Sequence, residues 1–216
     1  YSVYDGAAFA AMDGLTASFL TPFAIALNAS THIIAALTYV PHLFGAFAQL
    51  LTAKIVEILK DMKRIIVVTA FIHAIMWIPL LLIPYVSPDK KYLIIVYVSL
   101  QPIFAELMSP VWNSLMGDIV PVFERGKFFA FRNKIVGVVT FLAALAAGGI
   151  LSYFSPSNPF AGFAILFGIA FIARALSSVF RSMMHNPSVQ YKEGAKFSIV
   201  DFVKRMDKTN YGRFVT

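Results

Sequence analysis

The stretch NKIVGVVTFLAALAAGGIL, residues 133 to 151, decides the class of the fold, because no charged residue follows Lys134 within it. A bilayer core about 30 Å thick requires about 20 predominantly apolar residues per helix. The alanines and glycines of this stretch would let helix backbones approach closely within lipid, where no hydrophobic effect drives helices together. The stretch therefore predicts a transmembrane helix that packs tightly against its neighbours.

The rest of the chain has the same character. Of its 216 residues, 59% are hydrophobic and 13% are charged, and the mean hydropathy is +0.75, whereas soluble domains are about 45–50% apolar. Barrel strands would be about ten residues long with alternating polarity, which the long apolar runs do not show. We expect an all-α integral membrane protein with six transmembrane helices, in apolar windows at 4–27, 31–56, 65–86, 92–116, 128–154 and 159–183.

Lysine and arginine mark one side of the membrane. The chain has 18 basic residues and a net charge of +7, yet only Lys90 and Lys91 fall in connections on the other side. The positive-inside rule makes the basic side cytoplasmic, so we expect both ends of the sequence in the cytosol and the protein in the plasma membrane. Because this topology accounts for the positive charge, we predict no nucleic-acid partner.

A polar stripe along the fourth window contains an acid, Glu106. Its members, which follow one another at spacings of three and four residues and so share one helical face, are Ser99, Pro102, Glu106, Ser109 and Asn113. One central acid costs about 3 kcal/mol on the insertion scale, whereas the eleven Leu, Ile, Val and Phe residues of the window together contribute about −5 kcal/mol. The helix can therefore insert, and we expect Glu106 to face a water-filled cavity or a partner.

A second stripe and a second acid lie in the first two windows. The second window carries His32, Tyr39, His42 and Gln49 at near-heptad spacing. Asp13 lies about nine residues from the basic end of the first window, and Glu106 about ten from that of the fourth, so both are roughly 14–15 Å deep. We predict proton or cation coupling at Asp13 and Glu106, and a substrate cavity lined by Tyr39, His42, Gln49, Gln101 and Asn113.

Structural alternatives remain open for these residues. Each acid is either a coupling group or a structural partner, protonated or paired with Arg or Lys. His42 is expected to hydrogen-bond in the lining rather than carry protons, and His73 still more so. Arg174, in the sixth window, either pairs inside the bundle or extends toward the basic side.

Catalysis finds no support in the sequence. There is no Gly-rich phosphate loop, no H-E-x-x-H motif and no nucleophile elbow. The histidines lack close ligand spacing with a second acid, and the absence of cysteine excludes disulfides and thiolate metal sites. We therefore expect no enzymatic activity, no metal site and no cofactor.

The two halves of the chain share a weak internal likeness. In each, a membrane acid precedes a hydroxyl residue followed by proline: Asp13 with Thr21-Pro22, and Glu106 with Ser109-Pro110. Two successive units of three spans must have opposite orientations, as in the inverted repeats of many secondary transporters. We therefore expect two inverted three-helix repeats.

Two connections resemble those of the major facilitator superfamily. GDIVPVFERGKFFAFRN, residues 117 to 133, is similar to the fourth-to-fifth connection of that family, with Asp118, Pro121, Arg125 and Gly126 in the pattern D-x-x-P-x-x-x-R-G. AKIVEILKDMKR, residues 53 to 64, resembles its second-to-third turn, with Glu57 in the acidic position and Lys63 and Arg64 closing it. Ala53, Ile58 and Lys60 depart from that signature. The stretch RGKFFAFRN is similar to sequences from a prokaryotic, and on one reading archaeal, branch of this family.

The resemblance implies half of a twelve-helix major facilitator fold. Residues 1–183 would form the N-terminal six-helix bundle, and 184–216 a cytoplasmic linker with an amphipathic helix leading to a seventh span. The implied gating turns contain Glu57, Lys63, Arg64, Asp118, Arg125 and Gly126. The expected partners are membrane lipid, a small-molecule substrate, a proton or cation, and the C-terminal half.

The function implied is secondary active transport by alternating access, coupled to a proton or cation. One alternative is a non-transporting membrane module, a lipid-handling protein or scaffold, that reuses the fold. Another is a six-helix unit that dimerises.

Overall fold

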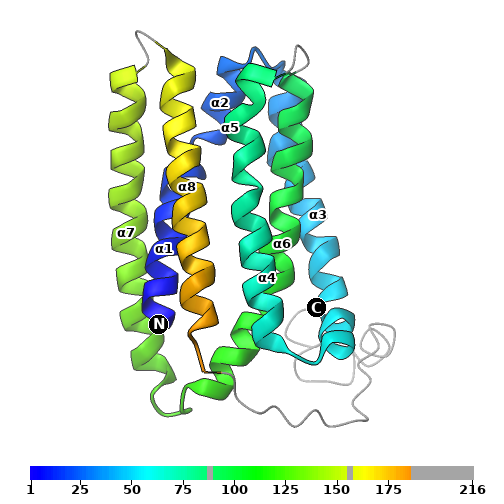
Figure 1. Ribbon diagram of the computed structural model, residues 1–216, viewed down its shortest axis with the longest axis vertical. Coiled ribbons are helices and arrows are strands. Elements are labelled where there is room, and N and C mark those ends of the chain that lie inside the picture. Colours follow the sequence, from blue (N-terminus) through cyan, green and yellow to red (C-terminus); the bar gives the residue numbers. More distant parts are fainter. Residues whose placement is uncertain (87–89, 155–157, 186–216) are drawn as a thin grey trace, which may run out of the picture.

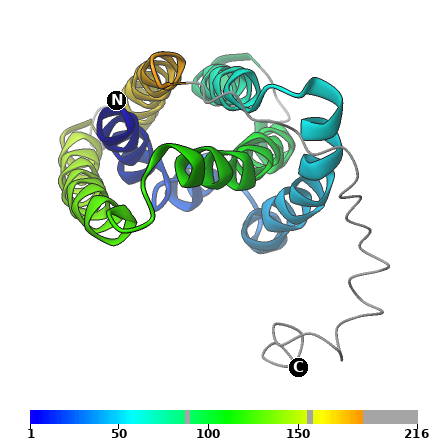
Figure 2. The ribbon, with the colours of Figure 1, turned by 90° about the horizontal axis from the view of Figure 1, so that it is seen from below.

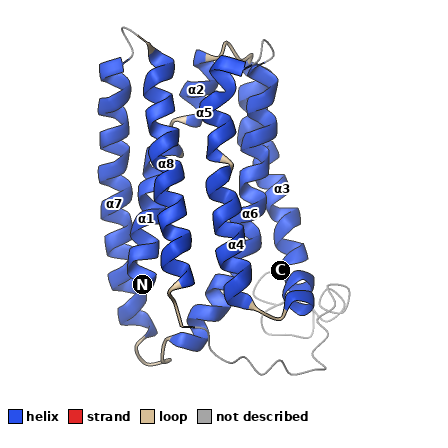
Figure 3. Cartoon of the chain, viewed as in Figure 1, coloured by secondary structure: helices blue, strands red, loops and turns tan. Residues whose placement is uncertain are grey.

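All six apolar windows form helices in the computed structural model, which describes residues 1–86, 90–154 and 158–185 (Figures 1 and 3). The described part of the chain contains helices and no strands. The helical stretches long and apolar enough to cross a membrane are Ser2–Ala26, Thr31–Leu59, Met62–Tyr85, Lys91–Ile119, Arg125–Phe154 and Pro159–Ser182. The expected six-span, all-α architecture is confirmed, and no window boundary differs from these by more than three residues. Most of the predicted linker, residues 186–216, lies outside the described residues.

Proline explains why two of the six spans are broken. The first consists of α1 (Ser2–Thr16) and α2 (Leu20–Ala26), and the third of α4 (Met62–Ile75) and α5 (Trp77–Val86). Pro22 and Pro79 have no N–H to donate to the carbonyl four residues earlier, and their rings crowd that turn. The remaining spans are single helices: α3 (Thr31–Leu59), α6 (Lys90–Ile119), α7 (Arg125–Phe154) and α8 (Pro159–Ser182).

The helices pack in two corresponding sets. In one, α1 packs against α7 and α8, and in the other α6 packs against α3 and α4, while α4 also contacts α8. We call the end at which α1 begins and α8 ends the basic end; it is the lower end in Figure 1. Seen from that end, in Figure 2, the last turns of α6 run across the bundle, and Pro110 within the helix accounts for the bend.

An aromatic core joins the spans toward the opposite end. Phe23 of α2 lies 5.1 Å from Phe163 and 4.9 Å from Phe167, ring centre to ring centre, both on α8. Trp77 of α5 stacks on Phe167 at 5.7 Å. All four side chains are at most 5% exposed, so they contribute both apolar burial and favourable ring geometry.

α1 and α7 approach each other closely at Gly14. A Cβ atom at Gly14 would lie 2.8 Å from the Cβ of Ala143 and against the carbonyl oxygen of Thr140. Within lipid such close backbone contact stabilises helix pairs through dispersion. The remaining surface of α7 is the least buried of the six spans and presents large apolar side chains such as Phe141 and Leu145.

Candidate functional site

Glu106 lies in the seam between α3 and α6. Gly45 of α3 provides the room for it, because a Cβ at that position would lie 3.0 Å from the Glu106 Cγ and 3.1 Å from the Pro102 Cβ. The Glu106 side chain is half-buried. It makes no ion pair or side-chain hydrogen bond with any residue that the structure describes. An acid inside a membrane span that pairs with none of the described residues needs water, an ion or another protein group as its partner.

Most of the predicted cavity residues have exposed side chains. Tyr39, His42 and Gln49 of α3 and Asn113 of α6 are all exposed. Gln101 is instead 7% exposed and lies inside the bundle, where its Nε2 has no hydrogen-bond partner among the described residues. The structure therefore leaves the first four accessible, whereas Gln101 is buried.

A groove of about 410 Å³ continues the seam toward the basic end. Thr52 of α3 joins its two walls by donating a hydrogen bond to the Leu107 carbonyl of α6, at 3.3 Å. The groove lining combines a few polar groups with apolar ones and consists of Gln49, Thr52, Ala53, Val56, Met62, Pro110, Val111 and Ser114. Of the predicted cavity residues, Gln49 alone belongs to this lining.

Asp13 occupies a different packing environment from Glu106. It lies on α1, next to the glycine that contacts α7, and its side chain is half-buried. It makes no ion pair or side-chain hydrogen bond within the described ranges, to Glu106 or to another residue. Each acid thus belongs to one of the two corresponding helix sets, Asp13 to α1–α7 and Glu106 to α6–α3.

The predicted gating turns are built around local caps. Arg125 donates from Nε to the Val120 carbonyl at 3.0 Å and from Nη2 to the Gly117 carbonyl, so it satisfies the free carbonyls at the end of α6. In the other turn Asp61 caps α4 by accepting from the Arg64 backbone N–H at 3.0 Å. The remaining predicted residues of these turns are exposed or, for Lys63, half-buried: Glu57, Lys63, Asp118 and Gly126.

A second polar group is buried inside the bundle near the basic end. Asp5 of α1 is fully buried, and its Oδ1 accepts hydrogen bonds from Arg181 Nε at 2.7 Å and Ser177 Oγ at 2.6 Å, both on α8. Its Oδ2 lies 3.8 Å from Nη2 of Arg132 on α7. One carboxylate therefore joins the first, fifth and sixth spans.

Arg174 extends this group further into the bundle. Its Nε donates to His73 Nδ1 at 3.0 Å, its Nη1 to Ser177 Oγ at 2.8 Å, and its Nη2 to Met108 Sδ at 3.3 Å. Because His73 accepts at Nδ1, its imidazole is neutral and carries its proton on Nε2. Arg181 Nη1 contacts the same sulfur. We call these seven residues the Asp5 cluster: Asp5, His73, Met108, Arg132, Arg174, Ser177 and Arg181.

Aromatic rings complete the surroundings of the cluster. The Arg174 guanidinium lies 5.1 Å from the ring centre of Phe9, and that of Arg132 lies 4.4 Å from that of Trp112. Both distances are within the range of cation–π attraction.

The sequence of the sixth span carries a signal for part of this cluster. Arg174, Ser177 and Arg181 follow one another at spacings of three and four, so they share one face of an otherwise apolar helix. Of the two alternatives for Arg174, the structure shows hydrogen bonding inside the bundle. Asp5 gives no such signal, because it lies close to the start of the first window, where a charge is inexpensive.

The sequence of this six-span bundle resembles that of a known protein family. The sequence model of the family described as Major Facilitator Superfamily matches residues 6–206 of the chain. The chain belongs to the major facilitator superfamily. No curated protein and no solved structure matches it. Members of the superfamily are transporters rather than enzymes, so this chain is a multi-pass membrane transporter of some solute.

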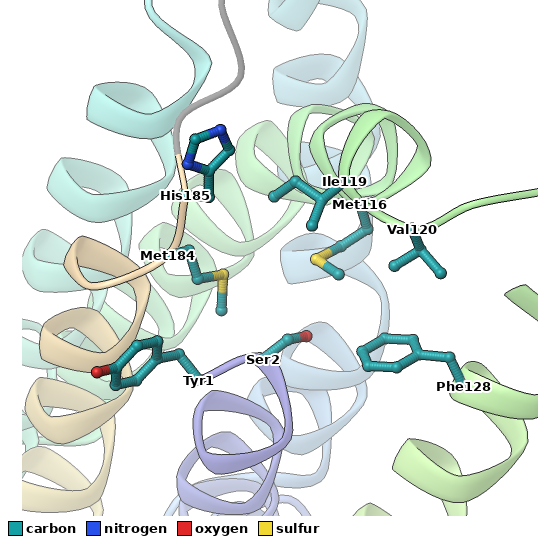
Figure 4. Close-up of a pocket in the computed structure, with 8 residues that line it drawn as sticks. All are labelled: Tyr1, Ser2, Met116, Ile119, Val120, Phe128, Met184 and His185. Carbon is teal, nitrogen blue, oxygen red and sulfur yellow. The ribbon is translucent and has the colours of Figure 1, made fainter. Parts of the chain in front are cut away.

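A further pocket of this major facilitator transporter opens at the basic end (Figure 4). It encloses about 240 Å³ between the start of α1, the end of α6, the start of α7 and the residues after α8. Its lining is mainly apolar and consists of Tyr1, Ser2, Met116, Ile119, Val120, Phe128, Met184 and His185. The described residues of the transporter contain no group of three or more His, Asp or Glu side chains placed to hold a metal ion.

Proposed function

We propose that this chain is the N-terminal half of a secondary active transporter that moves a small solute by alternating access, with its coupling acid at Glu106. The observation that carries the proposal is the position of this carboxylate: it is half-buried in a transmembrane seam, packs against Gly45, and pairs with no residue that the structure describes. In a protein of a transporter superfamily, an intramembrane acid of this kind is a coupling candidate by default.

Helix pairing supports two inverted repeats within this half. In such a repeat, spans one, two and three correspond to spans four, five and six. The contact between α1 and α7 then corresponds to that between α6 and α3, and the contact between α1 and α8 to that between α6 and α4. The α4–α8 pair is its own counterpart under the same correspondence. Asp13 and Glu106 then lie on corresponding spans, one in each repeat, and we assign both to proton or cation coupling.

The exposed polar side chains of the seam are proposed as substrate contacts. Tyr39, His42, Gln49 and Asn113 meet no polar partner within the described residues, so they are available to solute or to a second half of the transporter. Two six-helix halves that rock about a midplane site would enclose this side of the bundle. Membrane lipid would cover the apolar outer surface.

The orientation proposed follows from charge. The basic end carries the turn between α3 and α4 and that between α6 and α7, and the positive-inside rule places it in the cytoplasm. We assign the protein to the plasma membrane with both ends of this sequence cytoplasmic.

Proton movement tests the coupling assignment. The full-length protein, reconstituted into liposomes that contain a pH-sensitive dye, would be screened against small solutes that raise its thermal stability. We expect at least one solute to move protons with the wild type, and Glu106→Gln to reduce this at least tenfold while the solute still stabilises the protein. Glu124→Gln, at an exposed position between α6 and α7, is the matched control.

Three results would separate the parts of the proposal. Solute-dependent proton movement retained in Glu106→Gln would remove this acid from coupling. Solute uptake without proton movement, but with sodium dependence lost in Glu106→Gln, would identify a cation as the coupling ion. Binding without transport of any solute by the wild type would overturn the transport mechanism itself.

A further inference from the structure

The Asp5 cluster contains three guanidinium groups and a single carboxylate. Arg174 and Arg181 are 0% and 4% exposed, and the Arg132 side chain is 13% exposed. Asp5 is the one acid that pairs with any of them within the described residues. Buried charges are normally paired or coordinated, because removal from water without compensation is very costly. The cluster therefore carries more positive charge than its own carboxylate can neutralise.

Arg174 shows this excess most clearly. Its donors bind an imidazole nitrogen, a hydroxyl and a thioether, all of them uncharged. The Ser177 hydroxyl in turn donates to Asp5, so the carboxylate reaches Arg174 only through an intermediate group. A fully buried guanidinium is left without direct contact to an anionic side chain of the described chain.

The two buried arginines converge on one atom, the Sδ of Met108. Arg174 directs Nη2 to it, and Arg181 directs Nη1 to it, while Arg181 Nε binds Asp5. A thioether is a weak acceptor, so two charged donors meet at the poorest acceptor of the cluster. Methionine is also unbranched and flexible, which lets its side chain leave this position without movement of α6.

We propose that Arg174 and Arg181 form a binding site for a small inorganic anion, chloride, which replaces the Met108 thioether between the two guanidinium groups. Charge-assisted N–H donors from both arginines would then meet a charged acceptor. Arg181 binds the chloride and Asp5 through different nitrogens, so both anions fit around it. Chloride is monatomic and therefore needs less room between the two guanidinium groups than sulfate or phosphate.

Thermal stability of the full-length protein in detergent tests this site. A ligand that binds the folded state raises the Tm steadily once its concentration exceeds the Kd. We expect the Tm to increase with the logarithm of chloride concentration when chloride replaces gluconate at constant ionic strength. Arg174→Gln should abolish the increase, and Lys134→Gln, at an exposed position on α7, should retain it. Equal Tm values for the wild type in chloride and gluconate would overturn the proposal, as would an increase retained in Arg174→Gln.

Two further measurements do not depend on the folding of Arg174→Gln. Crystals of the wild type grown with bromide should show an anomalous peak between Arg174 and Arg181, and its absence at saturating bromide would overturn the site. Met108→Ala keeps both arginines and removes the side chain that chloride would displace, so it should lower the half-saturating chloride concentration. Loss of the chloride response in Met108→Ala, or stabilisation by sulfate but not by chloride, would contradict a halide that displaces the thioether.

Discussion

Asp5 and Arg181 are 176 positions apart in the sequence and lie 2.7 Å from each other, Oδ1 to Nε, in the interior of the bundle. The pair connects the start of the first span to the end of the sixth. Both side chains are at most 4% exposed. A buried ion pair contributes little net stability relative to apolar packing, but the loss of one partner leaves the other charge uncompensated.

Asp5→Asn should therefore destabilise the bundle strongly. The substitution keeps the shape of the side chain and removes its charge, so Arg181 and Arg132 lose their shared anion. We expect the free energy of unfolding to fall by about 3–5 kcal/mol, measured by denaturant titration in detergent with tryptophan fluorescence. Glu124→Gln removes an exposed acid and should change the same quantity by less than about 0.5 kcal/mol. Equal effects of the two substitutions would show that the Asp5 pairing has no special weight.

Lys60→Gly should stabilise the turn between α3 and α4. Lys60 follows the last residue of α3 with a φ of 52°, in the left-handed region, where a side chain costs roughly 1 kcal/mol and glycine costs nothing. We expect a gain of about 1 kcal/mol in the free energy of unfolding. Lys54→Gly, in the interior of α3, should lose about 1 kcal/mol. The two substitutions are therefore predicted to change the free energy of unfolding in opposite directions. A decrease for both would contradict the strain at Lys60.

The helices were predictable from the sequence because lipid imposes a simple rule. A span needs about 20 apolar residues with all backbone groups hydrogen-bonded internally, and each of the six windows meets it. The largest differences, of three residues, lie at the basic end, where α3, α4, α6 and α7 continue past the apolar window into polar sequence. Helical hydrogen bonding does not stop where hydropathy falls, so hydropathy alone could not place those ends.

The candidate site was less accessible to sequence analysis. Periodicity correctly placed Glu106 on a face with Pro102, because residues three and four apart share a face. Gln101, next to Pro102, lies off that face, and periodicity could not show that it is buried inside the bundle. Nor could it find the Asp5 cluster, whose charged members come from three spans distant in the sequence. Such contacts depend on which helices are neighbours, and a single helical repeat carries no information about that.

Cysteine labelling should reveal the orientation of the bundle. The 216 residues contain no cysteine, so labelling of a single introduced cysteine has no background from these residues. We expect Ser30→Cys, at an exposed position opposite the basic end, to react with an impermeant maleimide in intact cells. Glu124→Cys should react only after permeabilisation, because the positive-inside rule places its connection in the cytoplasm. The reverse pattern of accessibility would invert the proposed topology.

Gly14→Ala should destabilise the contact between α1 and α7, although alanine normally favours a helix. The added Cβ would lie 2.8 Å from that of Ala143 and against the Thr140 carbonyl oxygen, which belongs to the backbone and cannot rotate away. Overpacking of this kind typically costs about 1–3 kcal/mol. Gly137→Ala is the matched control, because nothing described lies within 4 Å of its added Cβ, and it should gain about 0.5–1 kcal/mol from helix propensity alone. Denaturant titration of both variants measures the difference. A gain at both positions would mean that α1 and α7 are further apart than the structure places them.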